Sequence, residues 1–142
     1  FYKKTLKPRC VIDLDTIMPG SILFDFGDSI RFGCNPAGED EKDLNKVVFN
    51  IEYFKSYVDG YLSELKNAMN KNEIDNLAFS AIIMTFECGM RFLDDYLDGD
   101  HYFKTKYSEH NLVRARTQFK LVEDMESCLN EMKNIVKSFS PL

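Results

Sequence analysis

The sequence predicts a mainly α-helical fold, a helical bundle preceded by one short β-hairpin, and three observations support this. From residue 47 onward, apolar side chains recur at three- and four-residue steps, which is the period of a helix with one buried face. Residues 77–92 are apolar nearly all round, as in a helix that is buried on most sides. Near the N-terminus, the apolar run Cys10 to Ile12 is typical of a short buried strand.

The first 38 residues are expected to hold the hairpin and a short helix. Residues 3–8 would form the hairpin turn and residues 9–14 its second arm. Asp25 to Gly33 is interpreted as a short helix, with Asp25 as the N-cap that accepts hydrogen bonds from free backbone N–H groups. Residues 34–38 contain Asn, Pro and Gly and are expected to form a loop.

Three longer helices are expected in the bundle, residues 39–142. Asn72 is a plausible N-cap for the second, which would run from Glu73 to about Leu97 and end at Asp98-Gly99-Asp100. Ser108 could cap the last. The first and last helices are predicted from apolar stripes, which are Val47, Ile51, Phe54, Val58, Tyr61, Leu65 and Met69, and Leu112, Ala115, Phe119, Val122, Met125, Leu129, Met132 and Val136.

Composition limits the classes of partner. The chain has 142 residues, one domain's worth, and its net charge of −5 argues against nucleic acid or an anionic membrane as the main partner. It contains no apolar stretch of the ~20 residues that span a bilayer. The N-terminus lacks the features of a signal peptide. The four cysteines lack metal spacing and three of them lie within apolar patterns, so we expect buried free thiols in a reducing cytoplasm. His101 and His110 are expected at the surface.

Two acidic clusters could hold a metal ion. Asp13 and Asp15 directly follow the predicted strand, where a rigid element would project carboxylates into a cleft, and carboxylate oxygens suit Mg²⁺. Asp13 is therefore the expected metal ligand. Asp15 could hold a metal-bound water or, equally, bond nearby backbone as a turn residue. The other cluster contains the triplet Asp25-Phe26-Gly27, but there the aspartate is better explained as a helix cap.

The segment VIDLDTIMPG followed by DFGDSIRFG, within residues 10–41, resembles the metal-binding segment of the aminoglycoside phosphotransferase/choline kinase group. Within that group it is most similar to the N-acetylhexosamine 1-kinases, which phosphorylate the anomeric hydroxyl of N-acetylglucosamine or N-acetylgalactosamine. The resemblance implies the later part of the C-terminal lobe of a kinase-like fold, with Asp13 as the Mg²⁺ ligand and ATP as co-substrate. Beyond residue 41 the similarity is confined to scattered positions.

Arg91 stands inside the apolar segment 77–92, where an unpaired buried guanidinium would cost several kcal/mol on order of magnitude. It could pair with Glu87 one turn earlier, or it could bind a ligand. The resemblance implies that Arg91 binds the sugar, together with Phe32 and Tyr102, because aromatic faces stack on sugar C–H groups. For Phe32, packing in the core is the alternative.

The sequence contains no His-x-Asp-x-x-x-x-Asn loop, which in this group carries the catalytic aspartate. In the family, that loop lies immediately before the segment matching Phe1. We therefore expect the chain to be a piece of a longer enzyme, inactive alone and prone to self-association. Two alternatives remain open: a phosphotransferase of the same group acting on choline, homoserine or an aminoglycoside, and a helical interaction module without catalysis.

Overall fold

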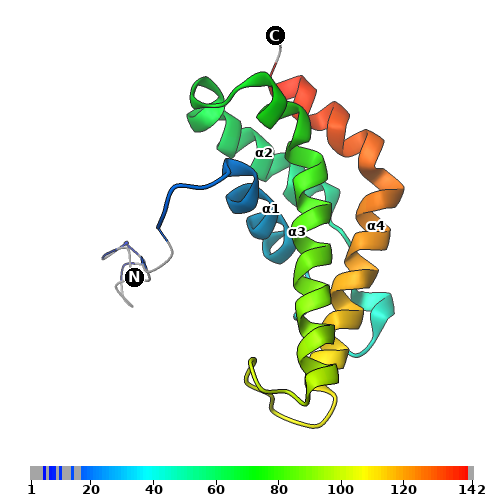
Figure 1. Ribbon diagram of the computed structural model, residues 1–142. Coiled ribbons are helices and arrows are strands. Elements are labelled where there is room, and N and C mark those ends of the chain that lie inside the picture. Colours follow the sequence, from blue (N-terminus) through cyan, green and yellow to red (C-terminus); the bar gives the residue numbers. More distant parts are fainter. Residues whose placement is uncertain (1–4, 6, 9, 11–13, 15–16, 141–142) are drawn as a thin grey trace.

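The structure is a computed structural model, and it describes residues 5, 7–8, 10, 14 and 17–140. The described part is mainly helical, which confirms the predicted fold class. Its α-helices, in chain order, are α1 (Ile22–Gly33), α2 (Ile51–Leu65), α3 (Lys71–Asp98) and α4 (His110–Phe139) (Figure 1).

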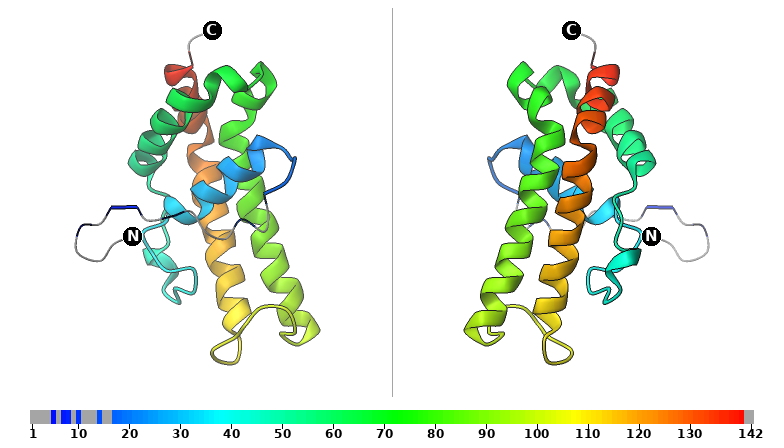
Figure 2. Two further views of the ribbon diagram at one scale, coloured as in Figure 1. Left: turned by 90° about the vertical axis from the view of Figure 1, so that its left-hand side faces the viewer. Right: turned by 90° about the vertical axis from the view of Figure 1, so that its right-hand side faces the viewer.

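The two longest helices, α3 and α4, run antiparallel and side by side, and the loop 99–109 joins them at one end (Figures 1 and 2). Helix α1 packs against α3, and α2 packs mainly against α4. The core lies among these helices. Its largest fully buried apolar side chains include Phe26, Phe54, Leu77, Leu121 and Met125.

The predicted β-hairpin, residues 1–14, falls largely outside the described residues. Those of its residues that are described have turn or irregular backbone rather than strand backbone: Thr5, Lys7, Pro8, Cys10 and Leu14. Asp13 and Asp15 also lie outside the described part of the chain.

Helix α1 begins earlier than predicted, and its cap is a different residue. The Ser21 hydroxyl accepts a hydrogen bond from the backbone N–H of Leu23 at 3.3 Å, so Ser21 is the N-cap and the assignment of Asp25 was wrong. Asp25 instead lies in the first turn, where the helix dipole favours a carboxylate. The physical reason is that Ile22 and Leu23, which precede Asp25, pack against the core as part of the helix.

The caps of α3 and α4 also differ from the prediction. Asn70, not Asn72, caps α3: its side chain accepts from the Glu73 N–H at 3.1 Å, while the Glu73 carboxylate accepts from the Asn70 N–H at 2.8 Å. This reciprocal capping box satisfies two free donors at once. Helix α4 follows Glu109, which has a left-handed φ of 66° and makes no side-chain cap bond, so Ser108 is not the cap.

The cysteines are free, but they are not uniformly buried. Cys34 lies in the core, and burial raises the pKa of its thiol to about 12. Cys88 and Cys128 are half-buried, and Cys10 is exposed. The expectation of buried thiols is therefore confirmed fully for Cys34 alone among the four.

Helix α1 crosses α3 at Gly27, where the two backbones approach closely. A Cβ atom built on Gly27 would lie 2.6 Å from the Ser80 carbonyl oxygen and 2.5 Å from the Met84 Cγ. Backbone cannot move aside as a side chain can, so α1 would have to shift. This contact holds α1 in place and, with it, the chain that follows.

We expect Gly27→Ala to lower the free energy of unfolding by ~1–3 kcal/mol through overpacking, measured by urea denaturation. Gly60→Ala is the matched control, because nothing lies within 4 Å of a Cβ at that position in α2. The control should be neutral or stabilising by up to ~1 kcal/mol, since Ala favours helix over Gly. Equal effects of the two substitutions would show that the α1–α3 crossing is not tight.

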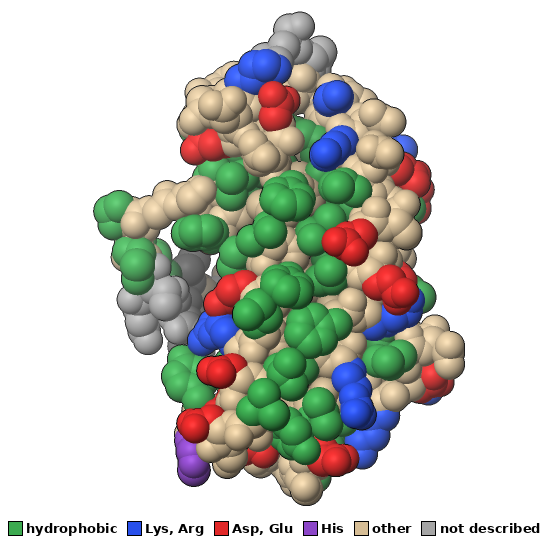
Figure 3. All heavy atoms as spheres, turned by 45° about the vertical axis from the view of Figure 1, so that its right-hand side comes forward, with side chains coloured by type: hydrophobic (Ala, Val, Ile, Leu, Met, Phe, Trp, Pro, Cys, Tyr) green, Lys and Arg blue, Asp and Glu red, His purple; other side chains and the backbone are tan. Residues whose placement is uncertain are grey.

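The apolar composition of α3 predicted that this helix is buried on most sides, and this prediction was wrong. One face packs on α1 and α4, but Phe79, Ile83, Phe86 and Met90 on the opposite face are 44–51% exposed. Figure 3 shows apolar side chains gathered on this face of the molecule. In the described part of the chain, α1 and α4 are the principal neighbours of α3, and two neighbours cannot cover a helix all round.

Among the described residues, none of the helices combines the length and apolar character needed to cross a bilayer.

Candidate functional site

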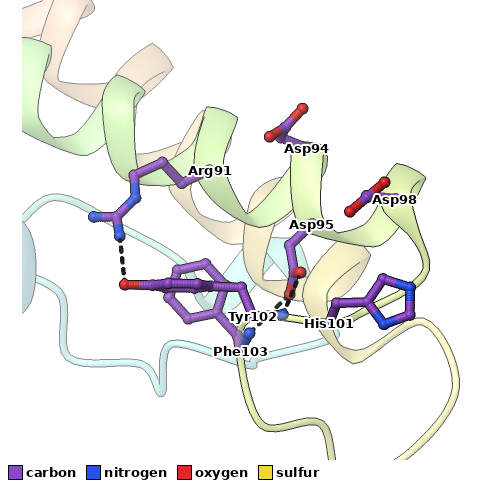
Figure 4. Close-up of a pocket in the computed structure, with 7 residues that line it drawn as sticks. All are labelled: Arg91, Asp94, Asp95, Asp98, His101, Tyr102 and Phe103. Atoms are coloured by element: carbon purple, nitrogen blue, oxygen red, sulfur yellow. Dashed lines mark hydrogen bonds between the residues drawn. The ribbon is translucent and has the colours of Figure 1, made fainter.

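A pocket of about 420 Å³ opens at the C-terminal end of α3. It brings together two of the residues predicted to contact substrate, Arg91 and Tyr102. Helix α3 supplies one wall and the loop that follows supplies the other (Figure 4). The lining residues are Arg91, Asp94, Asp95, Asp98, His101, Tyr102 and Phe103.

Asp95 holds the loop wall of this pocket in position. Asp95 is 6% exposed, and its carboxylate accepts hydrogen bonds from the backbone N–H groups of Tyr102 at 2.7 Å and Phe103 at 2.9 Å. The Asn111 side chain of α4 donates a third bond at 2.8 Å and also bonds Asp100. One carboxylate thus ties the end of α3, the loop and the start of α4 together. The sequence analysis did not single out Asp95, because the backbone N–H groups that bind its carboxylate come close to it only in the folded loop.

The turn that starts the loop needs a glycine. Gly99 ends α3 with φ of 99°, a left-handed conformation that L side chains rarely adopt, and Asp100 follows at φ of 62°. The predicted helix break at residues 98–100 is therefore confirmed. Phe103 then turns inward, and its ring lies 4.7 Å from that of Phe92. This packing leaves Tyr102 facing the pocket with 74% of its surface exposed.

The environment of Asp95 has a consequence for acid stability. Burial by itself raises the pKa of this carboxyl, but the backbone N–H groups of Phe103, Tyr102 and His101, together with the electrostatic effect of His101, outweigh burial and hold the pKa below its ordinary value. A carboxyl whose pKa is lower in the folded state stabilises the fold above its unfolded pKa of about 3.9. That stabilisation disappears as the pH falls through the folded pKa.

We expect Asp95→Asn to lower the free energy of unfolding at pH 7, and the gap to the parent chain to shrink as pH falls below ~4. Denaturant unfolding of both chains from pH 7 to pH 3 measures this gap. Asp94→Asn, an exposed neighbour on the same helix, should change little at either pH. A gap for Asp95→Asn that stays constant with pH would show that the ionised carboxylate is not what holds the loop.

Arg91 lies at the surface, so the expectation that it is buried was wrong. Its side chain is 51% exposed, and its Nε lies 3.7 Å from the Glu87 carboxylate. Its Nη2 donates to the Tyr102 hydroxyl at 3.4 Å, and the guanidinium lies 5.6 Å from the ring centroids of both Tyr102 and Phe103. Because the ion pair with Glu87 is exposed and long, it contributes little stability. The guanidinium is therefore available to a ligand in the pocket.

The pocket also carries exposed negative charge. Asp94 and Asp98 lie one turn apart on α3 and are both exposed. In Figure 4, Asp94 points away from the Tyr102 and Phe103 rings, whereas Arg91 points toward them. A ligand between these groups would meet a hydrogen-bonding cation at one end and carboxylates at the other.

Phe32 does not share this pocket. It is 72% exposed, so the alternative that it packs in the core is wrong, and it borders a separate hollow of about 170 Å³. A further hollow of about 550 Å³ shares Arg91 and Phe103 with the first pocket and Arg31 and Glu39 with the hollow beside Phe32. The three predicted substrate residues therefore lie along one continuous surface, with only Arg91 and Tyr102 in contact.

The acidic loop after α1 is a structural clamp. Glu39 bonds Arg31 at 2.9 Å and lies 3.7 Å from Arg114 of α4. Asp40 lies 3.1 Å from the His110 Nε2 and 3.5 Å from the Lys106 ammonium. The hydrogen bond from His110 is the largest cause that holds the pKa of Asp40 below its ordinary value. These contacts fasten the loop to the first half of α4.

His110 is fully buried, so its predicted surface position was wrong. Its Nδ1 accepts from the Lys106 backbone N–H at 3.1 Å. The proton must therefore be on Nε2, which donates to Asp40. The sequence feature that could have indicated an acidic partner for His110 was the run Glu39-Asp40-Glu41. The sequence alone does not show that this run lies against residue 110.

No metal site can be assigned from the described residues. Among them, no group of three His, Cys, Asp or Glu side chains lies close enough to hold an ion. Asp13, the predicted ligand, and Asp15, which could hold a metal-bound water or bond nearby backbone, are outside that part of the chain, so their roles remain predictions. No protein-family model matches the chain.

Proposed function

We propose that this chain is part of an ATP-dependent kinase that phosphorylates the anomeric hydroxyl of an N-acetylhexosamine in the cytoplasm. The observation that carries the proposal is the contact between Arg91 and Tyr102. Both residues were assigned to sugar binding from the resemblance, and the fold brings them together on one pocket although they are eleven positions apart in the chain.

In the proposed site, each residue has a chemical role. Arg91 donates hydrogen bonds to a hydroxyl or acetamido oxygen of the sugar, and the exposed Tyr102 ring stacks on its C–H face. Asp95 keeps that ring in place through the backbone of the loop. Phe32 borders the separate hollow on the same surface and would contact a part of the acceptor that lies away from Arg91.

Asp13 is the residue proposed to bind the Mg²⁺ ion that contacts the ATP phosphates. Its carboxylate and that of Asp15 are the oxygen donors that Mg²⁺ prefers, so the donor chemistry fits that ion. Mg²⁺ would neutralise charge on the ATP phosphates during transfer. The catalytic aspartate that takes the proton of the sugar hydroxyl would come from a loop that precedes this chain in the longer enzyme.

A second acceptor class is favoured by a specific observation. Asp94 and Asp98 are exposed carboxylates that line the same pocket as two aromatic side chains, a combination that suits a cationic amine. An amine acceptor such as choline or an aminoglycoside would place its charge there. The guanidinium of Arg91 repels such a cation, which is why we favour the uncharged N-acetylhexosamine.

An acceptor screen tests the proposal. The enzyme that contains this chain should consume ATP with N-acetylglucosamine or N-acetylgalactosamine and form the sugar 1-phosphate, whereas the 142-residue chain alone should not. ATP consumption with choline or an aminoglycoside, and none with the sugars, would select the second acceptor class. Sugar phosphate formed by the isolated chain would contradict the assignment of the base to another segment.

A further inference from the structure

The outward face of α3 carries a continuous row of exposed apolar side chains, which we call the α3 outer stripe. It consists of Phe79, Ile83, Phe86, Met90 and Leu97, which are 44%, 45%, 45%, 51% and 74% exposed, with the half-buried Leu93 in the same row. Figure 3 shows apolar side chains running along this face. The function proposed above uses none of these side chains.

The spacing of the stripe is that of a helix–helix seam. Its six members follow one another at steps of four, three, four, three and four residues, which is the heptad pattern of helices that pack side by side. At 1.5 Å per residue, the stripe is ~27 Å long. Phe119 of α4 widens it, because its ring lies 5.9 Å from that of Phe86. An elongated partner of helical shape would cover such a row.

The size of the stripe matches an association surface. Aromatic side chains bury roughly 150–250 Å² each. With an area of the same order for Ile, Met and Leu, the exposed fractions leave on the order of 500 Å² of apolar surface. That is at the upper end of what monomers expose. With the rim residues that any partner would also cover, the face approaches the ~800 Å² per partner of a standard stable interface.

We propose that the α3 outer stripe binds a second copy of this chain, with the two α3 helices antiparallel about a two-fold axis near residue 88. The step pattern reads the same in both directions, so an antiparallel copy is complementary to it position by position. Phe86 then faces Met90 of the other copy, Ile83 faces Leu93, and Phe79 faces Leu97. Such a self-complementary patch is what a two-fold dimer requires.

The oligomeric state of the 142-residue chain tests this. Sedimentation equilibrium is measured at chain concentrations from about 1 to 100 µM. This range covers the dissociation constants that an interface of this size can have when its contacts are not optimised. We expect a dimer in this range. Ile83→Glu and Phe86→Glu should each weaken it by ~100-fold or more, because an unpaired carboxylate would be buried in the interface.

Tyr53→Glu is the matched control, since Tyr53 is 53% exposed but lies on α2. It should leave the dimer intact, and circular dichroism should show that all the variants remain helical. A parent chain that is monomeric at the highest concentration, or a dimer that survives both stripe substitutions, would overturn the proposal.

The orientation is tested by cross-linking with a short bis-maleimide. A cysteine at Phe86 lies close to its equivalent across the axis, whereas equivalent cysteines at Leu97 are separated by ~27 Å along antiparallel helices. Phe86→Cys should therefore add an intermolecular cross-link beyond the parent's own cysteines, and Leu97→Cys should not. Cross-linking through both positions would show a parallel pair and overturn the antiparallel arrangement.

Discussion

In the kinase proposed above, replacing Asp13 by Asn is expected to abolish sugar-dependent ATP turnover while the melting temperature stays nearly unchanged. The carboxylate is assigned to Mg²⁺, and phosphoryl transfer depends on the metal to neutralise charge on the phosphates. An amide oxygen is a much weaker ligand for a hard cation. Steady-state kinetics and thermal unfolding of the same preparation measure the two effects.

Asp25→Asn is the control for this prediction, because Asp25 belongs to the Asp-Phe-Gly triplet that a simple motif search would select. Asp25 is exposed in the first turn of α1, and Ser21 caps that helix. We therefore expect Asp25→Asn to leave turnover intact. Its loss of stability should be smaller than that of Ser21→Ala, which removes the cap and should lower the free energy of unfolding by ~1 kcal/mol. Turnover lost in Asp25→Asn and kept in Asp13→Asn would reverse the assignment of the metal ligand.

The second large effect is expected for Arg91→Met, which should lower kcat/KM for the sugar by ~10²-fold or more and leave the KM for ATP nearly unchanged. A charged hydrogen bond of about 1.5–3 kcal/mol is lost and its partner on the sugar is left unpaired. Stability should hardly change, because Arg91 is exposed and its ion pair with Glu87 is long.

Two further variants separate substrate binding from a role in the fold. Arg116→Met removes another exposed arginine, on α4, and should leave the sugar kinetics intact. Glu87→Gln combined with Arg91→Met should not restore kcat/KM, since Glu87 is only an exposed ion-pair partner of Arg91. Restoration by the double replacement would mean that Arg91 acts through Glu87 and not on the sugar.

The sequence predicted the helices well because their signals are local. The apolar stripe of α4 is an example. Four of its eight predicted members, Ala115, Met125, Met132 and Val136, are buried, and the other four are half-buried. The end of α3 at Gly99 was also predicted correctly, because glycine readily adopts the left-handed conformation that ends a helix. Helix starts were less well predicted, since Ser21 and Asn70 compete with nearby polar residues that could also cap, and packing decides among them.

What the sequence could not predict depends on contacts between distant residues. The sequence of an apolar helix indicates how much apolar surface could be buried, but the number of neighbouring helices decides how much is buried. Among the described residues, α3 has two principal neighbours. The same limit explains Arg91, which was expected inside the bundle only because α3 was. His110 was misplaced because its partner Asp40 is seventy residues away.

The central claim, that the Arg91–Tyr102 pocket holds the acceptor sugar, is tested most directly by NMR titration of the isotopically labelled chain with N-acetylglucosamine. We expect saturable shifts of the Arg91 side-chain Nε–H and of the Tyr102 and Phe103 amides, and their loss in Arg91→Met. Choline should give no comparable shifts. Shifts at these residues with choline and none with the sugar would contradict the claim.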